Sequence, residues 1–124
     1  MNDQTTNWNV REDAPSFTTA ERAVHALLAH KAEDVVVLDL RQGSDVADLF
    51  LIATGTSEPQ VTALTKAVMD ELREVGEKPL STEGVEQGRW ALLDYVDLVI
   101  HVMQPATREY YQLERLWNDA ARLD

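Results

Sequence analysis

The sequence predicts one mixed α/β (α+β) domain, in which a five-stranded mixed sheet is packed by helices in the order α-β-β-α-β-β-β-α. Three observations indicate this fold class. Two short apolar stretches, 35–40 and 49–54, lie between segments with helical periodicity. Apolar residues recur every three or four positions over 61–75, which is typical of an amphipathic helix. Two further apolar stretches, 89–95 and 98–103, are close enough in sequence to form a hairpin.

The first expected element is a helix that follows a polar N-terminal segment. Residues 1–17 are polar and aperiodic, and we expect a flexible arm there ahead of a domain over 18–124. Thr18 and Glu21 form a capping-box pattern, and apolar residues at helical spacing continue to Lys31. A helix with one apolar side needs a sheet to pack on.

The central part of the chain has the clearest local signals. The turn-forming cluster at 42–45 separates the first two strands, which should therefore pair antiparallel. Ser57 is a suitable N-cap for the second helix, Pro59 suits its first turn, and Gly76 supplies its end. A strand expected at 78–82 follows this helical crossover and should run parallel to the strand before the helix.

The last three elements are a strand pair and a helix. Strands 89–95 and 98–103 should turn near Val96 and Asp97, and Pro105 should end the second of them. A final helix is expected over 107–117. Its apolar side would come from Tyr110 or Tyr111, Leu113, Leu116 and Trp117.

Charge restricts the classes of partner. The 124 residues include 22 Asp and Glu against 11 Lys and Arg, a formal charge of −11. Affinity for nucleic acid depends on cations that contact phosphates, so we expect little direct contact with RNA or DNA. An acidic surface instead favours fast capture of a basic protein, such as a ribosomal protein or a histone.

Other composition features suggest a cytoplasmic protein. The sequence has no cysteine, which excludes disulfides and thiolate metal sites. Its apolar runs are far shorter than the roughly 20 residues of a membrane-spanning helix. Residues 1–10 do not resemble a secretory signal, so we expect neither export nor membrane attachment.

Motifs for catalysis are missing or incomplete, and we expect no catalytic residue, metal or cofactor. His25 and His30 should point in different directions from one helix, and His101 is more typical of a structural histidine. Gly43 and Ser44 ahead of Asp48 resemble the start of a metal-dependent nucleotidyltransferase site, but Phe50 replaces the second carboxylate. The alternative interpretation is a plain turn.

Another incomplete motif lies at the strand-to-helix junction 54–57, where backbone N–H groups could bind an anion. Helix capping by Ser57 already explains the residues there.

The strand at 90–95 has large apolar groups on both faces. Alternation directs Trp90, Leu92 and Asp94 to one side. It directs Ala91, Leu93 and Tyr95 to the other. Either the first set is a protein-binding patch with carboxylates beside it, or helices bury both faces; the sequence pattern leaves both interpretations open.

Several motifs, in order, resemble the ribosomal silencing factor family, also called RsfS or Iojap. They span about residues 20–118 and are 34–39 (DVVVLD), 48–57 (DLFLIATGTS), 60–61 (QV), 83–84 (EG), 89–95 (RWALLDY), 97–103 (DLVIHVM) and 111–117 (YQLERLW). The resemblance implies a fold similar to nucleotidyltransferases without the catalytic site. It also implies a non-enzymatic factor that represses translation when nutrients are scarce, and organellar relatives that act in large-subunit assembly.

The implied partner is the large ribosomal subunit, bound through its protein L-fourteen so that the small subunit cannot join. By position in the family motifs, the implied contacts are Glu83, Gly84, Trp90, Leu92, Asp94, Tyr95, Asp97 and Tyr111. The competing hypotheses are a metal-dependent nucleotidyltransferase and a module that forms a homodimer through the Trp90 side of the sheet when free.

Overall fold

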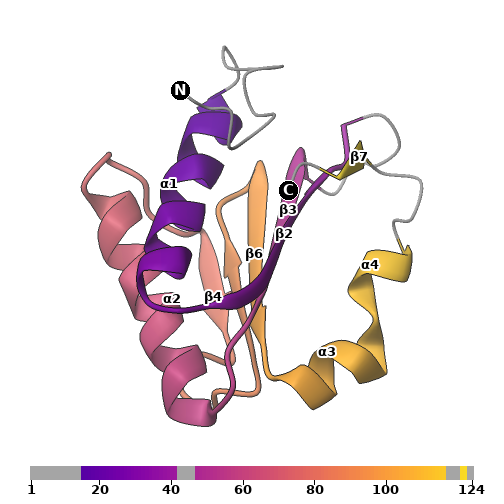
Figure 1. Cartoon of the computed structure of the whole chain (residues 1–124). Helices are drawn as coiled ribbons and strands as arrows, with labels where there is room; N and C mark the ends of the chain where they lie inside the picture. Colours follow the sequence, from indigo (N-terminus) through magenta and orange to yellow (C-terminus); the bar gives the residue numbers. More distant parts are fainter. Residues whose placement is uncertain (1–14, 42–46, 117–120, 123–124) are drawn as a thin grey trace.

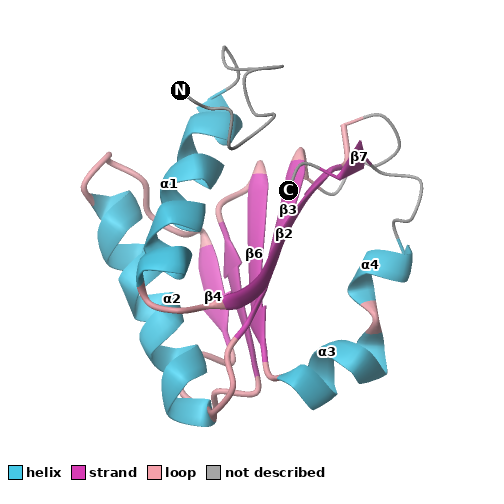
Figure 2. Cartoon of the chain, viewed as in Figure 1, coloured by secondary structure: helices cyan, strands magenta, loops and turns pink. Residues whose placement is uncertain are grey.

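The computed structural model describes residues 15–41, 47–116 and 121–122, and its centre is one mixed sheet with helices on both faces (Figures 1 and 2). The strands are β2 (Glu33–Asp39), β3 (Leu49–Thr54), β4 (Ser81–Glu83), β5 (Trp90–Asp94), β6 (Leu98–Met103) and β7 (Ala121–Arg122). The helices are α1 (Pro15–Ala29), α2 (Glu58–Arg73), α3 (Pro105–Tyr111) and α4 (Leu113–Leu116).

The strand order is β4-β5-β6-β3-β2-β7. β3 and β6 pair parallel, and the other neighbours pair antiparallel. The expected antiparallel pairs β2–β3 and β5–β6 are therefore confirmed, and β4 extends the second pair into a meander. β4 runs in the same direction as β3, as predicted, although β5 and β6 lie between them. The short strand β7, which was not predicted, adds a sixth strand beside β2.

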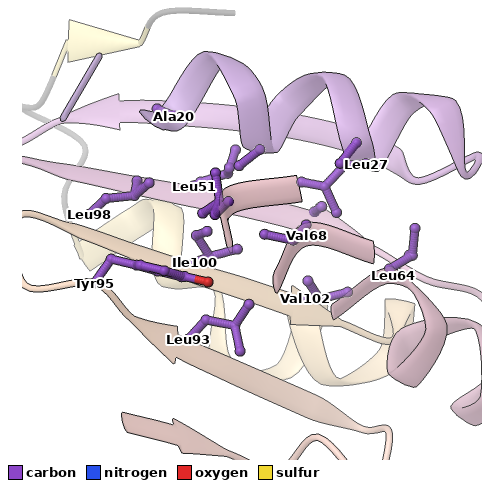
Figure 3. Packing of buried hydrophobic residues seen from close by; sticks show 14 of the residues in the cluster. Ala20, Leu27, Leu51, Leu64, Val68, Leu93, Tyr95, Leu98, Ile100 and Val102 are labelled. Carbon is purple, nitrogen blue, oxygen red and sulfur yellow. The ribbon is translucent and has the colours of Figure 1, made fainter. Parts of the chain in front are cut away.

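α1 and α2 cover one face of the sheet and form the larger hydrophobic core with it (Figure 3). The buried side chains from α1 include Ala23 and Leu27, and those from α2 include Leu64 and Val68. They pack on side chains of alternate sheet positions, such as Leu51, Leu93 and Ile100. The burial of this apolar surface is the main driving force that holds the two helices on the sheet.

Local capping determines the ends of α2, as the sequence indicated. The Ser57 hydroxyl accepts the backbone N–H of Gln60 at 3.1 Å, which satisfies a donor in the first turn. At the other end Gly76 adopts a φ of 83°, and the N–H of Glu77 donates to the carbonyl of Leu72 at 2.9 Å. This is a Schellman-type end that favours glycine.

The start of α1 differs from the prediction. The helix begins at Pro15 rather than after Thr18, so residues 15–17 belong to α1 and not to an arm. Proline fits the first turn because the N–H it lacks has no helical partner there. The rest of the expected arm, residues 1–14, lies outside the described residues.

The predicted final helix is divided in two. Gln112 adopts a left-handed φ of 48°, which ends α3 before α4 begins. Leu113 is buried as expected. Of the two tyrosines, Tyr110 is 81% exposed, whereas Tyr111, 51% exposed, packs its ring against Trp90. Trp117 lies outside the described residues.

The β5–β6 turn contains a strained residue. Val96 has a φ of 74°, a conformation in which a β-branched side chain is a rare outlier. The N–H of Asp97 donates to the carbonyl of Tyr95 across Val96 at 2.9 Å, and Asp94 Oδ1 accepts the N–H of Val96 at 2.8 Å. These two hydrogen bonds hold the turn in a geometry that strains the backbone at Val96.

Replacing Val96 with glycine is expected to stabilise the protein by about 1 kcal/mol. Glycine removes a strain of about 1–3 kcal/mol but adds about 0.5–1 kcal/mol of unfolded-state entropy. Urea unfolding measures the difference. Val75→Gly is the matched control, because this valine also lies in an exposed turn but is not among the described residues with positive φ. An equal loss of stability in both variants would contradict the assignment of strain to Val96.

Candidate functional site

The face of the sheet opposite α1 and α2 carries the candidate site. Cross-strand pairing aligns Trp90 with Met103 and Leu92 with His101, so these side chains lie on one face. A second cluster is buried there, with Trp90 and Leu92 packed against it and only partly buried. Its buried members are Val36, Leu38, Leu40, Ala47, Phe50, Ile52, Val99, Met103 and Leu113.

The short helices α3 and α4 lie on this side of the sheet (Figure 2). No described residue of α3 is buried, so this helix adds little to the core. We define the Trp90 face as Glu83 of β4, Trp90, Leu92 and Asp94 of β5, and Tyr111 of α3. The predicted alternation along β5 is confirmed, because Ala91 and Leu93 lie in the other cluster.

Trp90 is held between two ring systems. Its indole Nε1–H donates to His101 Nδ1 at 3.0 Å. The Tyr111 ring lies with its centroid 4.7 Å from that of Trp90, and Phe50 contacts His101 at a centroid distance of 4.8 Å. Trp90 is therefore half-buried, with its orientation fixed by a hydrogen bond and by ring packing.

His101 is a buried neutral histidine. It is 4% exposed, and burial lowers its pKa from 6.5 to about 4. A tryptophan indole only donates, so Nδ1 must be unprotonated and the proton must reside on Nε2. Among the described residues, Nε2 has no hydrogen-bond partner.

Tyr95 does not share the Trp90 face. It is 8% exposed and lies in the cluster beneath α1 and α2, as Figure 3 shows. Burial, followed by the charge of Glu77, raises its pKa to about 12, while Arg73 acts in the opposite direction. Motif position placed Trp90 and Tyr95 in one implied contact set, but the two side chains lie on opposite faces of the sheet.

Glu83 and Gly84 lie where β4 leads into the loop before β5. Glu83 is exposed and pairs with Leu92 across the strands. Gly84 has a φ of 72°, and a Cβ there would lie 2.1 Å from the carbonyl oxygen of Trp90. Glycine is therefore required for the close approach of this loop to β5.

Asp94 and Asp97 flank the strained turn. The carboxylate of Asp94 caps it by accepting the N–H of Val96. The carbonyl of Asp97 accepts the N–H groups of Asp48 and Leu49 at 2.9 and 3.0 Å, while the residue itself is exposed. Both residues lie at the end of β5 away from Trp90.

Arg108 fixes α3 to the sheet, a role that no sequence pattern indicated. Its Nη1 donates to the carbonyl of Asp34 at 2.7 Å and to the hydroxyl of Thr54 at 2.8 Å. A hollow of about 440 Å³ lies beside it and is lined by both carboxylates and guanidinium groups. These opposite charges offset each other, so the hollow does not select a charged ligand of either sign. Its lining residues are Glu33, Asp34, Thr54, Pro105, Arg108, Glu109, Gln112 and Arg115.

The competing sites gain no support from the geometry. Phe50, where a nucleotidyltransferase would need its second carboxylate, is buried against His101. At the start of α2, Gln60 Oε1 accepts the N–H of Thr56 at 2.6 Å, so one donor of the suggested anion site is already used. No group of three metal-ligating side chains occurs within the described part of the chain. The turn at 43–45 lies outside it.

No helix in the described ranges has the length and apolar character needed to cross a membrane.

Comparison with known proteins identifies the family. The family described as ribosomal silencing factor during starvation, RsfS, matches residues 12–124. The chain belongs to the RsfS family. The ribosomal silencing factor RsfS of Bacillus subtilis (strain 168) is 43% identical over 94 residues, which cover 76% of this chain and 80% of that protein.

The fold and a more distant relative agree with this assignment. A crystal structure of a Chromobacterium violaceum protein superposes with a TM-score of 0.79 at 39% identity, covering 82% of this chain and 84% of that one. A Mus musculus protein named mitochondrial assembly of ribosomal large subunit protein 1 is 30% identical over 97 residues, 76% of this chain and 42% of that protein. The resemblance inferred from the motifs is confirmed, and the RsfS match also includes α1.

Gly84→Ala is expected to destabilise the RsfS fold by about 3 kcal/mol or more, because the new Cβ collides with backbone at Trp90. Gly76→Ala is the control: its φ of 83° is also positive, but nothing lies within 4 Å of its Cβ position. The control should lose only about 1 kcal/mol of conformational strain. Chemical denaturation of the two variants separates the clash from the strain, and similar losses would contradict the close approach.

Stability is expected to fall as the pH decreases from 6.5 towards 4. His101 has a folded pKa of about 4, below its ordinary 6.5, so the unfolded chain binds the proton first. The resulting loss of stability, up to about 3 kcal/mol, is absent above pH 6.5 and develops as the pH falls towards 4. Urea unfolding of the wild type and His101→Leu across this range measures it. Equal slopes for the two proteins would show that His101 does not titrate with folding.

Proposed function

We propose that this RsfS protein binds the large ribosomal subunit through ribosomal protein L-fourteen and sterically blocks association with the small subunit, which represses translation. Family membership supports a ribosomal silencing role. The printed name of the mouse relative refers to assembly of the large subunit, so the same contact would also suit a role in large-subunit biogenesis. The observation that carries the proposal is the half-buried Trp90 on a sheet face that short helices cover incompletely.

Aromatic anchors support the Trp90 face as the contact surface. Tryptophan and tyrosine dominate the binding energy of protein interfaces, particularly where apolar neighbours exclude water. Trp90 has Leu92 beside it in the second cluster and the Tyr111 ring against it. A partner that covers this face would bury aromatic surface that the free protein leaves accessible.

Charge supports a basic partner. The chain carries a formal charge of −11, and the exposed Glu83 belongs to the Trp90 face. Carboxylates near an aromatic anchor favour lysine and arginine on the partner and accelerate their encounter. The same charge opposes direct contact with ribosomal RNA. We therefore infer binding through a basic ribosomal protein, in the cytoplasm.

The contact set we propose consists of Glu83, Trp90, Leu92, Asp94, Asp97 and Tyr111. Gly84 would act by shaping the loop beside Trp90, because it has no side chain to offer and a Cβ there would collide with the backbone of β5. Tyr95 would support β5 from the buried side and not touch the partner directly. Binding of this kind needs affinity and bulk, not catalysis, since about 800 Å² of buried surface on each partner is enough for a specific complex.

Trp90→Ala is expected to weaken binding to isolated large subunits by about 2 kcal/mol, or thirtyfold, as truncation of an interface anchor does. Co-sedimentation measures the affinity, and circular dichroism checks that the fold is retained. Leu28→Ala is the matched control, because Leu28 is a large side chain, 56% exposed, on α1 across the sheet. Its affinity should equal that of the wild type.

Subunit joining, followed by light scattering, tests the function itself. Excess wild-type protein should prevent joining, and the Trp90→Ala variant should require a higher concentration. Normal joining with saturating wild-type protein would refute the blocking mechanism. The mass of the free protein tests the homodimer hypothesis, which requires the Trp90 face to be occupied by a second copy.

A further inference from the structure

We propose that His101 is a positioning residue that fixes the indole of Trp90 in the orientation in which the ribosomal partner contacts it. The inference rests on the proposed function, since it assumes that Trp90 is an anchor for that partner. It adds a specific role for a buried residue that does not touch the partner.

The geometry of the sheet connects the two side chains. Leu92 is the direct cross-strand partner of His101, so Trp90 is a diagonal neighbour on the same face, within reach of a long side chain. The indole N–H donates to His101 Nδ1 at 3.0 Å. From β3, Ile52 pairs with His101 and the Phe50 ring packs on it, which holds the imidazole from the other side.

A histidine at position 101 reduces the stability of the fold. All residues of β6 are buried, and the protonated Nε2 of His101 has no partner within the part of the chain that the structure describes. A buried donor without an acceptor costs about 1–3 kcal/mol, whereas a leucine would fill the position without that cost. What histidine supplies and leucine cannot is the acceptor for Trp90.

The hydrogen bond also determines what Trp90 can offer a partner. Because its single N–H is already used, the indole presents carbon surface and π-electrons instead of a donor. Tyr111 packs against the indole ring and restricts the approach. The partner group that meets Trp90 is therefore an apolar side chain or the stem and cation of a lysine or arginine.

Binding of full-length variants to isolated large ribosomal subunits tests the role. His101→Leu removes the acceptor and should weaken binding about fivefold to tenfold, the equivalent of one hydrogen bond. His101→Asn should restore most of the affinity, because asparagine carries its oxygen on Cγ, where histidine carries Nδ1. Trp90→Phe removes the donor, so adding His101→Leu to it should cause no further loss.

Two measurements separate positioning from general stability. The urea midpoint of His101→Leu at pH 7 should equal or exceed that of the wild type although binding falls. The indole N–H resonance of Trp90, assigned by its disappearance in Trp90→Phe, should exchange faster in His101→Leu than in the wild type or His101→Asn. A purely structural role would instead reduce stability and binding together.

The outcomes distinguish this inference from the proposed function. If His101→Leu binds like the wild type while Trp90→Ala does not, the positioning role is wrong and the Trp90 contact stands. If His101→Leu weakens binding equally with Phe at position 90, His101 does not act through the indole N–H. If both Trp90→Ala and His101→Leu bind like the wild type, the Trp90 face is not the contact surface and both proposals fail.

Discussion

The two-residue period of β5 is the constraint on which the arrangement of this protein depends. Ala91 and Leu93 enter the core beneath α1 and α2, so Trp90 and Leu92 must point to the opposite face. β5 is the second strand from the edge of the sheet. The edge strand beside it, β4, is short and all of its residues are exposed. Large apolar groups consequently remain half-covered at this side of the sheet, and that incomplete cover is what makes a protein-binding surface possible.

The sequence allowed those elements to be predicted whose limits depend on neighbouring residues. Ser57 and Gly76 define α2 through local hydrogen bonds, and β3 and β6 are mostly apolar, fully buried strands with the predicted limits. The ends that were wrong have other causes. Pro15 begins α1 although Thr18 looks like a cap, and Gln112 divides the last helix by a left-handed conformation that no glycine marks.

The candidate site was predictable in part for a similar reason. Alternation along one strand correctly separated Trp90 from Tyr95, whereas motif position alone placed them in one contact set. The bond between Trp90 and His101 depends on the register of β5 against β6, and the contacts of Arg108 join segments distant in sequence. Register and docking of α3 result from tertiary packing, so a single sequence gives no local signal for either.

The presence of two separate clusters explains how such a surface can be kept without loss of the fold. The larger cluster joins α1 and α2 to the sheet and contains neither Trp90 nor His101. On the smaller cluster's side of the sheet, the buried Nε2 of His101 has no hydrogen-bond partner among the described residues. Buried polar groups of this kind reduce stability, but they fix side-chain orientation, because a hydrogen bond is directional and hydrophobic packing is not. For the proposed contact with a basic ribosomal protein, such a hydrogen bond would keep the Trp90 ring in one orientation at the cost of some stability.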